Sequence, residues 1–222
     1  AILFPGQGSQ IVGMGLEFYN NFEIVKKIFE KADEQLNYKI SKIILEGPED
    51  KLKLTQNTQP AILTVSYAIF SVLKKEYNFD FKSTKFFAGH SLGEYSALVC
   101  SESLDFNDAL FLLFERGKSM QEAVPVGKGS MIAVLGSKID ELNNLIKEAK
   151  IKGVCEIAND NAEGQTIISG DIESVNLLQS ILKKNSKKFI SLNVSAPFHC
   201  SLMSPAATKM KEKINLVDFK KP

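Results

Sequence analysis

Residues 86–99 read FFAGHSLGEYSALV, an apolar run that stops at Gly89, turns through Ser91 and resumes with helical spacing. Gly89-x-Ser91-x-Gly93 is the pattern of a nucleophile elbow, in which a strained turn between a strand and a helix exposes a serine hydroxyl. The flanking glycines allow this turn without a Cβ clash. A helix N-terminus that merely prefers small residues is the alternative. The strand predicted before the motif and the helix predicted after it favour a reactive serine in an α/β fold.

The pattern of apolar residues around this corner predicts a body built from helices and short strands. Helices are predicted at residues 22–36, 40–45, 49–54, 60–77 and 105–123, and short strands at residues 2–4 and 85–88. The apolar helix at 60–77 is expected to open at Pro60, because proline is favoured in a first helical turn. Its apolar stretch is too short to cross a bilayer.

A second segment has a different order of elements. Strands are predicted at residues 130–135, 154–158, 165–169 and 188–194, helices at 139–149 and 172–182, and a turn at 159–164. This β-α-β-β-α-β order is the ferredoxin-like pattern. We therefore predict a ferredoxin-like small subdomain at residues 128–192, inserted into an α/β body formed by residues 1–127 and 193–222.

The bulk composition argues against several classes of protein. A formal net charge of +1 on 222 residues gives no electrostatic reason to expect nucleic-acid binding. The three cysteines are an odd number without paired spacing, which fits a reducing compartment. We recognise neither a signal peptide nor a membrane span, so we expect a soluble, cytoplasmic protein. The two histidines and the cysteines lack the spacing of zinc ligands, so no metal is expected.

A serine nucleophile needs a base, and histidine suits this task near neutral pH. His90 adjoins Ser91, so its side chain should point elsewhere on a tight turn, although it could support the turn. His199 lies in a proline-stiffened loop after a predicted strand, where catalytic groups are often placed, and we interpret it as the base. A structural histidine is the alternative, and the adjacent Cys200 is interpreted as packing.

The developing oxyanion needs hydrogen-bond donors. One is expected to be the backbone N–H of Leu92, directly after the nucleophile. A second could come from FPGQGSQ, residues 4–10, a glycine-rich turn after the first strand. Dinucleotide or phosphate binding is the competing interpretation of that turn. It is disfavoured because the third glycine of the dinucleotide motif is missing and the chain contains no G-x-x-x-x-G-K.

Arg116 is the only arginine among 27 basic residues. A guanidinium in a chain that otherwise uses lysine suggests a task that an ammonium cannot perform. Gripping a carboxylate with two parallel hydrogen bonds is such a task. Chance is the alternative.

Four motifs occur in the order FPGQGSQ (residues 4–10), GHSLGEYSALV (89–99), RGKSMQEAVP (116–125) and PFHCSLM (197–203), with NDNAEGQTIISGD (159–171) between the last two. Together they resemble the malonyl-CoA:acyl-carrier-protein transacylases of bacterial fatty-acid synthesis, over essentially the whole chain. The resemblance implies an α/β-hydrolase-like body with a ferredoxin-like insert. It also implies that Ser91 is the nucleophile, that His199 is the base, and that the backbone amides of Gln7 and Leu92 form the oxyanion hole.

The same resemblance implies three substrate-binding residues. Arg116 would hold the free carboxylate of the malonyl group, which agrees with the argument from the lone arginine. Met120 would line the acyl pocket, with ordinary helix packing as the alternative. Phe198 would leave little room for a substituent at C2 and so disfavour methylmalonyl, a preference of about 1–3 kcal/mol for one methyl group.

The implied reaction is a ping-pong transfer. Malonyl passes from malonyl-CoA to Ser91 and then to the phosphopantetheine thiol carried by acyl carrier protein, without a permanently bound cofactor. We expect a monomer that binds neither nucleic acid nor membrane. Family members extend several dozen residues further, so we expect a truncated chain whose missing part orients His199.

Two other functions remain open at this point. A serine hydrolase, either an esterase or a thioesterase, would use the same elbow, but it gives no reason for Arg116 or for the inserted subdomain. A carrier-binding module that has lost its chemistry is the non-enzymatic alternative.

Overall fold

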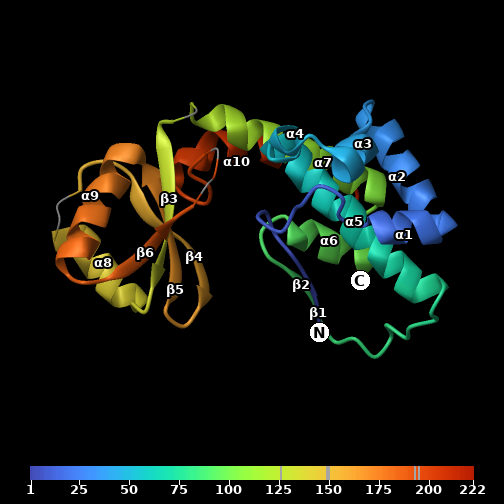
Figure 1. Cartoon of the computed structure of the whole chain (residues 1–222), viewed down its shortest axis with the longest axis horizontal. Helices are drawn as coiled ribbons and strands as arrows, with labels where there is room; N and C mark the ends of the chain where they lie inside the picture. Colours follow the sequence, from blue (N-terminus) through green and yellow to red (C-terminus); the bar gives the residue numbers. More distant parts are fainter. Residues whose placement is uncertain (126, 149–150, 193, 195) are drawn as a thin grey trace. The chain divides into compact units, whose positions relative to one another are not determined.

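The structure, a computed structural model, describes residues 1–125, 127–148, 151–192, 194 and 196–222, and it divides into two compact units (Figure 1). One unit comprises Ala1–Lys118 and Met210–Pro222, and the other comprises Ser119–Lys209. Helices and strands are mixed along the chain, which confirms the predicted α/β class. Among the described residues, no helix combines the length and the apolar character that crossing a bilayer requires.

The first unit is built around one long helix, α5. Its elements are β1 (Ile2–Phe4), α1 (Leu16–Asn21), α2 (Glu23–Leu36), α3 (Ile40–Glu46), α4 (Glu49–Leu52), α5 (Thr55–Lys75), β2 (Phe87–Gly89), α6 (Gly93–Cys100) and most of α7 (Phe106–Ala123). Helix α5 packs against α2, α3, α4 and α6. Fully buried Leu63 of α5 belongs to the same apolar core as Leu110 and Leu113 of α7. This core holds α7, the helix that carries the predicted site residue Arg116.

The start of α5 differs from the prediction. The helix begins at Thr55, so Pro60 lies inside it rather than in its first turn. The Thr58 hydroxyl donates to the carbonyl of Leu52 at 2.6 Å, and the Asn57 amide donates to that of Lys51 at 2.9 Å. These bonds tie the early turns of α5 to α4. The helix therefore starts earlier than its apolar periodicity indicates.

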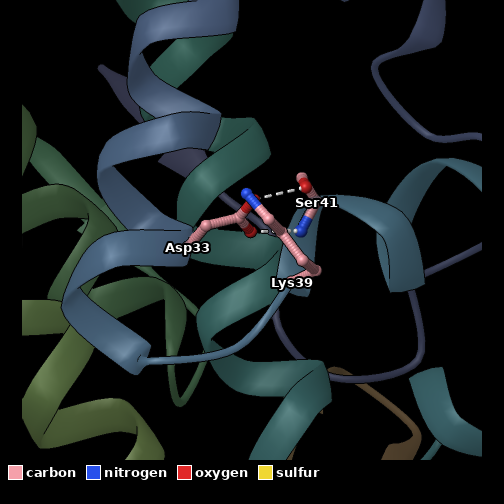
Figure 2. A network of polar contacts seen from close by, with 3 residues as sticks. All are labelled: Asp33, Lys39 and Ser41. Carbon is pink, nitrogen blue, oxygen red and sulfur yellow. Dashed lines mark hydrogen bonds and ion pairs between the residues drawn. The ribbon is translucent and has the colours of Figure 1, made fainter.

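A buried carboxylate joins α2 to α3. Asp33 accepts hydrogen bonds from the backbone N–H of Ser41 at 2.8 Å and from its hydroxyl at 2.7 Å, and Lys39 Nζ lies 3.3 Å from the same carboxylate (Figure 2). Ser41 is in the first turn of α3, where backbone N–H groups lack intrahelical partners and negative charge is favoured. Asp33 therefore fixes the turn between the two helices.

The second unit contains an antiparallel sheet. Its elements are the end of α7, β3 (Gly129–Leu135), α8 (Ile139–Glu148), β4 (Cys155–Ala162), β5 (Gln165–Asp171), α9 (Ile172–Lys184), β6 (Lys188–Ser191), the 3-10 helix η1 (Ser201–Met203) and the start of α10 (Ser204–Ile214). The strand order is β4-β5-β3-β6. From β3 to β6 the elements follow one another in the predicted order. Ala149 and Asn193, predicted to lie in a helix and in a strand, are outside the described residues.

The predicted turn at residues 159–164 is wrong for most of its length. Strand β4 continues to Ala162 and β5 begins at Gln165, so only Glu163 and Gly164 form the turn, with Gly164 at a φ of 73°. The register of β4 against β5 shifts twice within the pair. Asparagine and aspartate are typical of turns, but bulges allow them to remain in an exposed part of a strand.

Alternate residues of β3 cover opposite faces of the sheet, as the pleat of a strand requires. Ile132 and Val134 belong to the core formed with α8 and α9, whose ribbons lie beside the sheet in Figure 1. Met131 and Ala133 belong to a different core, which also contains Met120, Phe198 and Met203. The second core therefore buries two of the predicted site residues.

Candidate active site

Ser91 lies on the turn between β2 and α6. Strand β2 ends at Gly89, α6 begins at Gly93, and Ser91 between them has a φ of 53°, in the left-handed region that residues with a Cβ rarely adopt. The N–H of Gly93 donates to the carbonyl of His90 at 2.9 Å, which closes the turn. A serine in a strained strand-to-helix turn is the geometry expected of a nucleophile elbow.

Close backbone approach explains both glycines of the motif. A Cβ on Gly89 would lie 1.9 Å from the carbonyl carbon of Gly93, and a Cβ on Gly93 would lie 2.5 Å from the carbonyl oxygen of Phe4. Neither distance is compatible with a side chain at that position. The elbow therefore depends on glycine for the contact between its own two ends and for its contact with β1.

The parallel pairing of β1 with β2 places the glycine-rich turn beside the elbow. Phe4 pairs with Gly89 in the ladder, and the N–H of His90 donates to the carbonyl of Phe4 at 3.1 Å. A Cβ on Gly6 would lie 2.5 Å from His90 Nδ1, so the imidazole packs directly against this turn. The segments that carry the backbone amides of Gln7 and Leu92 are thus neighbours.

Arg116 contacts the predicted nucleophile. Its Nη2 donates to Ser91 Oγ at 3.0 Å, and its Nη1 donates to Gln59 Oε1 at 2.7 Å. Burial lowers the pKa of the Arg116 guanidinium, although arginine stays protonated in proteins. The structure therefore brings a partly buried positive charge on α7 and the serine of the elbow together, although the two are distant in sequence.

Gln59 is a site residue that the sequence did not predict. Its side chain is fully buried on α5, and its amide oxygen accepts the hydrogen bond from Arg116. The available signal was an uncharged polar residue directly before an apolar helical run, because buried polar groups need partners. The partner itself depends on how α5 packs against α7.

His199 lies in a tightly held loop of the second unit, with a φ of 59°. Before it, the N–H of Phe198 donates to the sulfur of Met131 at 3.3 Å. After it, Ser201 donates to the Glu156 carboxylate from its N–H at 2.8 Å and from its hydroxyl at 2.6 Å. Contacts with two strands therefore fix the loop on both sides of the imidazole.

The other side chains of this region are mostly buried. Met120 and Phe198 both pack in the core against β3, and the acyl-pocket role of Met120 stays a prediction. Burial also raises the pKa of the Cys200 thiol, which is unfavourable for a thiolate nucleophile. The first unit thus carries Gln7, Ser91, Leu92 and Arg116, and the second carries Met120, Phe198 and His199. The approach of His199 to Ser91 stays a prediction.

Known proteins resemble this chain over its whole length. The family model described as "Acyl transferase domain" matches residues 2–222. The chain is 45% identical to the malonyl CoA-acyl carrier protein transacylase of Bacillus subtilis (strain 168), covering 99% of this chain and 69% of the relative.

Solved structures are similar as well. The acyl-carrier-protein-S-malonyltransferase from Bartonella henselae matches with a TM-score of 0.95 and 41% identity, over 100% of this chain and 71% of that one. A malonyl-transacylase in complex with its type II PKS acyl-carrier protein matches with a TM-score of 0.94 and 39% identity, over 100% and 71%.

Proposed function

The chain belongs to the malonyl CoA-acyl carrier protein transacylases, within the acyl transferase domain family, and we propose that it transfers malonyl through an ester of Ser91. It is an acyltransferase that moves the malonyl group from malonyl-CoA to acyl carrier protein. The acceptor is the thiol of the phosphopantetheine arm, which the carrier protein brings to the reaction.

The reaction has two half-steps at the elbow. Ser91 Oγ attacks the thioester carbonyl of malonyl-CoA, His199 accepts the hydroxyl proton, and the CoA thiol leaves with that proton. The carrier thiol then attacks the malonyl ester and gives its proton to His199, which returns it to the Ser91 oxygen. The backbone amides of Gln7 and Leu92 stabilise the oxyanion in both half-steps. The strained turn at Ser91 and the adjacent β1 turn support this assignment.

One observation carries the choice of malonyl, namely the 3.0 Å contact between Arg116 Nη2 and Ser91 Oγ. The carboxylate of a malonyl ester is separated from the ester carbonyl by a single methylene group. A guanidinium beside the ester oxygen is therefore within reach of that carboxylate, and its planar N–H groups match it bidentately. A hydrolase of neutral esters has no use for such a charge. Met120 and Phe198 are proposed to limit the space around the acyl group.

We also propose a finer description of the fold. Residues 1–127 and 193–222 form the α/β-hydrolase-like catalytic body, and residues 128–192 form the ferredoxin-like small subdomain. The β-α-β-β-α-β element order and the antiparallel sheet order β4-β5-β3-β6 support the second part of this proposal. The monomeric state and the cytoplasmic location stay predictions.

The mass of the intact protein after exposure to malonyl-CoA tests this function. One malonyl group should add to the native chain and leave again when phosphopantetheine-loaded carrier protein is supplied. Ser91→Ala should gain no mass, whereas the control Ser83→Ala, at an exposed serine outside the elbow, should behave as the native chain does. Rapid release of free malonate without carrier protein would indicate a hydrolase and contradict the proposal.

A further inference from the structure

The charge of Arg116 is held by neutral groups. Gln59 and Ser91 accept hydrogen bonds from its guanidinium, at 2.7 and 3.0 Å, through an amide oxygen and a hydroxyl oxygen. The ion pairs within 4.0 Å between described residues all involve lysine, and none involves Arg116. A partly buried guanidinium that has no carboxylate of the described residues within 4.0 Å is costly, because desolvation is only partly offset by neutral acceptors and by the more distant charge of Glu94. An anionic ligand would complete this arrangement.

Gln59 fixes where the guanidinium points. The residue is fully buried and lies next to Pro60, whose carbonyl accepts the Thr64 hydroxyl at 2.8 Å. A side chain packed in a core has little freedom to change rotamer. Its amide oxygen accepts hydrogen bonds but carries no charge. Gln59 can therefore orient Arg116 without neutralising it.

The early turns of α5 contact both the helix that carries Arg116 and the turn that carries Gln7. A Cβ on Gly117 would lie 2.6 Å from the Cα of Gln56 and from the carbonyl oxygen of Thr55, so α7 meets α5 backbone to backbone beside Arg116. The Thr55 hydroxyl also accepts a hydrogen bond from the Gln7 side chain at 3.3 Å. The position of α5 therefore sets the positions of Arg116 and of the Gln7 turn together.

We propose that Gln59 is a specificity-determining positioning residue, whose neutral amide holds Arg116 beside Ser91 and leaves its charge for the carboxylate of the acyl group. This inference rests on the proposed function. A carboxylate at position 59 would satisfy the guanidinium permanently and compete with the substrate. A neutral acyl group such as acetyl does not bind to that charge, so the rate of acetyl transfer would fall little.

The substitution Gln59→Glu tests the inference, because it changes charge at nearly constant shape. The ratio of kcat/KM for malonyl-CoA to kcat/KM for acetyl-CoA should fall about 100-fold, while acetyl transfer changes less than about tenfold. Gln179→Glu, the same chemical change on α9 of the second unit, should leave the ratio unchanged within about twofold. Equal losses for both acyl groups, or an unchanged ratio, would overturn the proposal.

Gln59→Ala separates positioning from charge. It removes the anchor without adding a competitor, so it should reduce the ratio less than Gln59→Glu does. A purely structural role for Gln59 predicts the opposite order, because alanine leaves a cavity and removes one of the acceptors of the guanidinium. Circular dichroism of both variants establishes that they are folded before rates are compared.

The lone arginine permits a measurement that does not depend on activity. Arginine labelled with ¹³C and ¹⁵N yields a single guanidinium in the NMR spectrum, because Arg116 is the only arginine. The Nη1 and Nη2 signals should be distinct in the native chain and should merge in Gln59→Ala, where the group can rotate. Distinct signals in that variant would overturn the anchoring role. Failure of the native chain to load malonyl would instead overturn the proposed function, and this inference with it.

Discussion

Arg116→Ala should change which acyl group the protein accepts. The Nη2 of Arg116 donates a hydrogen bond to Ser91 Oγ at 3.0 Å. A hydrogen bond to a charged group contributes about 1.5–3 kcal/mol, so a two-bond grip on the malonyl carboxylate contributes about 3–6 kcal/mol. The kcat/KM for malonyl-CoA should therefore fall about 10²- to 10⁴-fold. Acetyl transfer loses only the contact with Ser91, so it should fall about tenfold or less.

The assay compares initial rates of transfer from malonyl-CoA and from acetyl-CoA to the same phosphopantetheine-loaded carrier protein. Lys118→Ala, an exposed position on the same helix, is the matched control and should leave both rates unchanged. Arg116→Lys should also lose malonyl transfer. The two Nη atoms of the guanidinium contact Gln59 and Ser91, and a single ammonium nitrogen cannot replace both.

A change in stability must be separated from a change in specificity. Removing Arg116 leaves the buried Gln59 amide oxygen without this donor, which should cost about 1–3 kcal/mol of unfolding free energy. Urea unfolding of the variant measures that cost directly. If malonyl and acetyl transfer fall by the same factor in a folded Arg116→Ala variant, the carboxylate-binding role is wrong.

Three predictions concern the second unit. Burial acts to raise the pKa of Asp171, but hydrogen bonds from Ser174 and from neighbouring N–H groups outweigh it and hold this pKa below its ordinary value. Asp171→Ala removes these hydrogen bonds, so it should lower the unfolding free energy by about 1–2 kcal/mol at pH 7. A carboxyl whose pKa is lowered by folding stabilises fully above its unfolded-state pKa and loses that contribution as the pH falls to its folded-state pKa, so urea titrations should show this deficit shrinking through the acidic range. Glu156→Ala should slow malonyl loading about 3- to 10-fold by freeing Ser201, without altering the malonyl-to-acetyl ratio; a changed ratio would show that Glu156 also acts on acyl-group selection. Burial raises the pKa of Cys155 to about 12, so iodoacetamide at pH 8 should label it only after unfolding, as mass spectrometry of peptides would show.

The elbow could be predicted because its signals are local. The strand, the two glycines and the helix that surround Ser91 are consecutive in sequence, and each restricts the same short piece of backbone. The start of α5 could not be predicted in this way. It depends on Thr58 and on hydrogen bonds to α4, which no periodicity within α5 reveals.

The site residues also differ in how far the sequence alone predicts them. Arg116 stood out by its rarity, which is visible in the sequence alone. Gln59 carried only the weak signal of a polar residue next to an apolar run, and its meaning depends on which helix packs opposite. The loop of His199 shows a third case, because its link to Glu156 joins residues on distant segments.

The short parallel pairing between β1 and β2 affects when activity appears during folding. Phe4 and Gly89 are paired although most of the helical body lies between them in sequence. Closing so long a loop is entropically slow compared with winding a helix. During refolding from denaturant, helical dichroism should recover first, and serine acylation should return only after this ladder has formed.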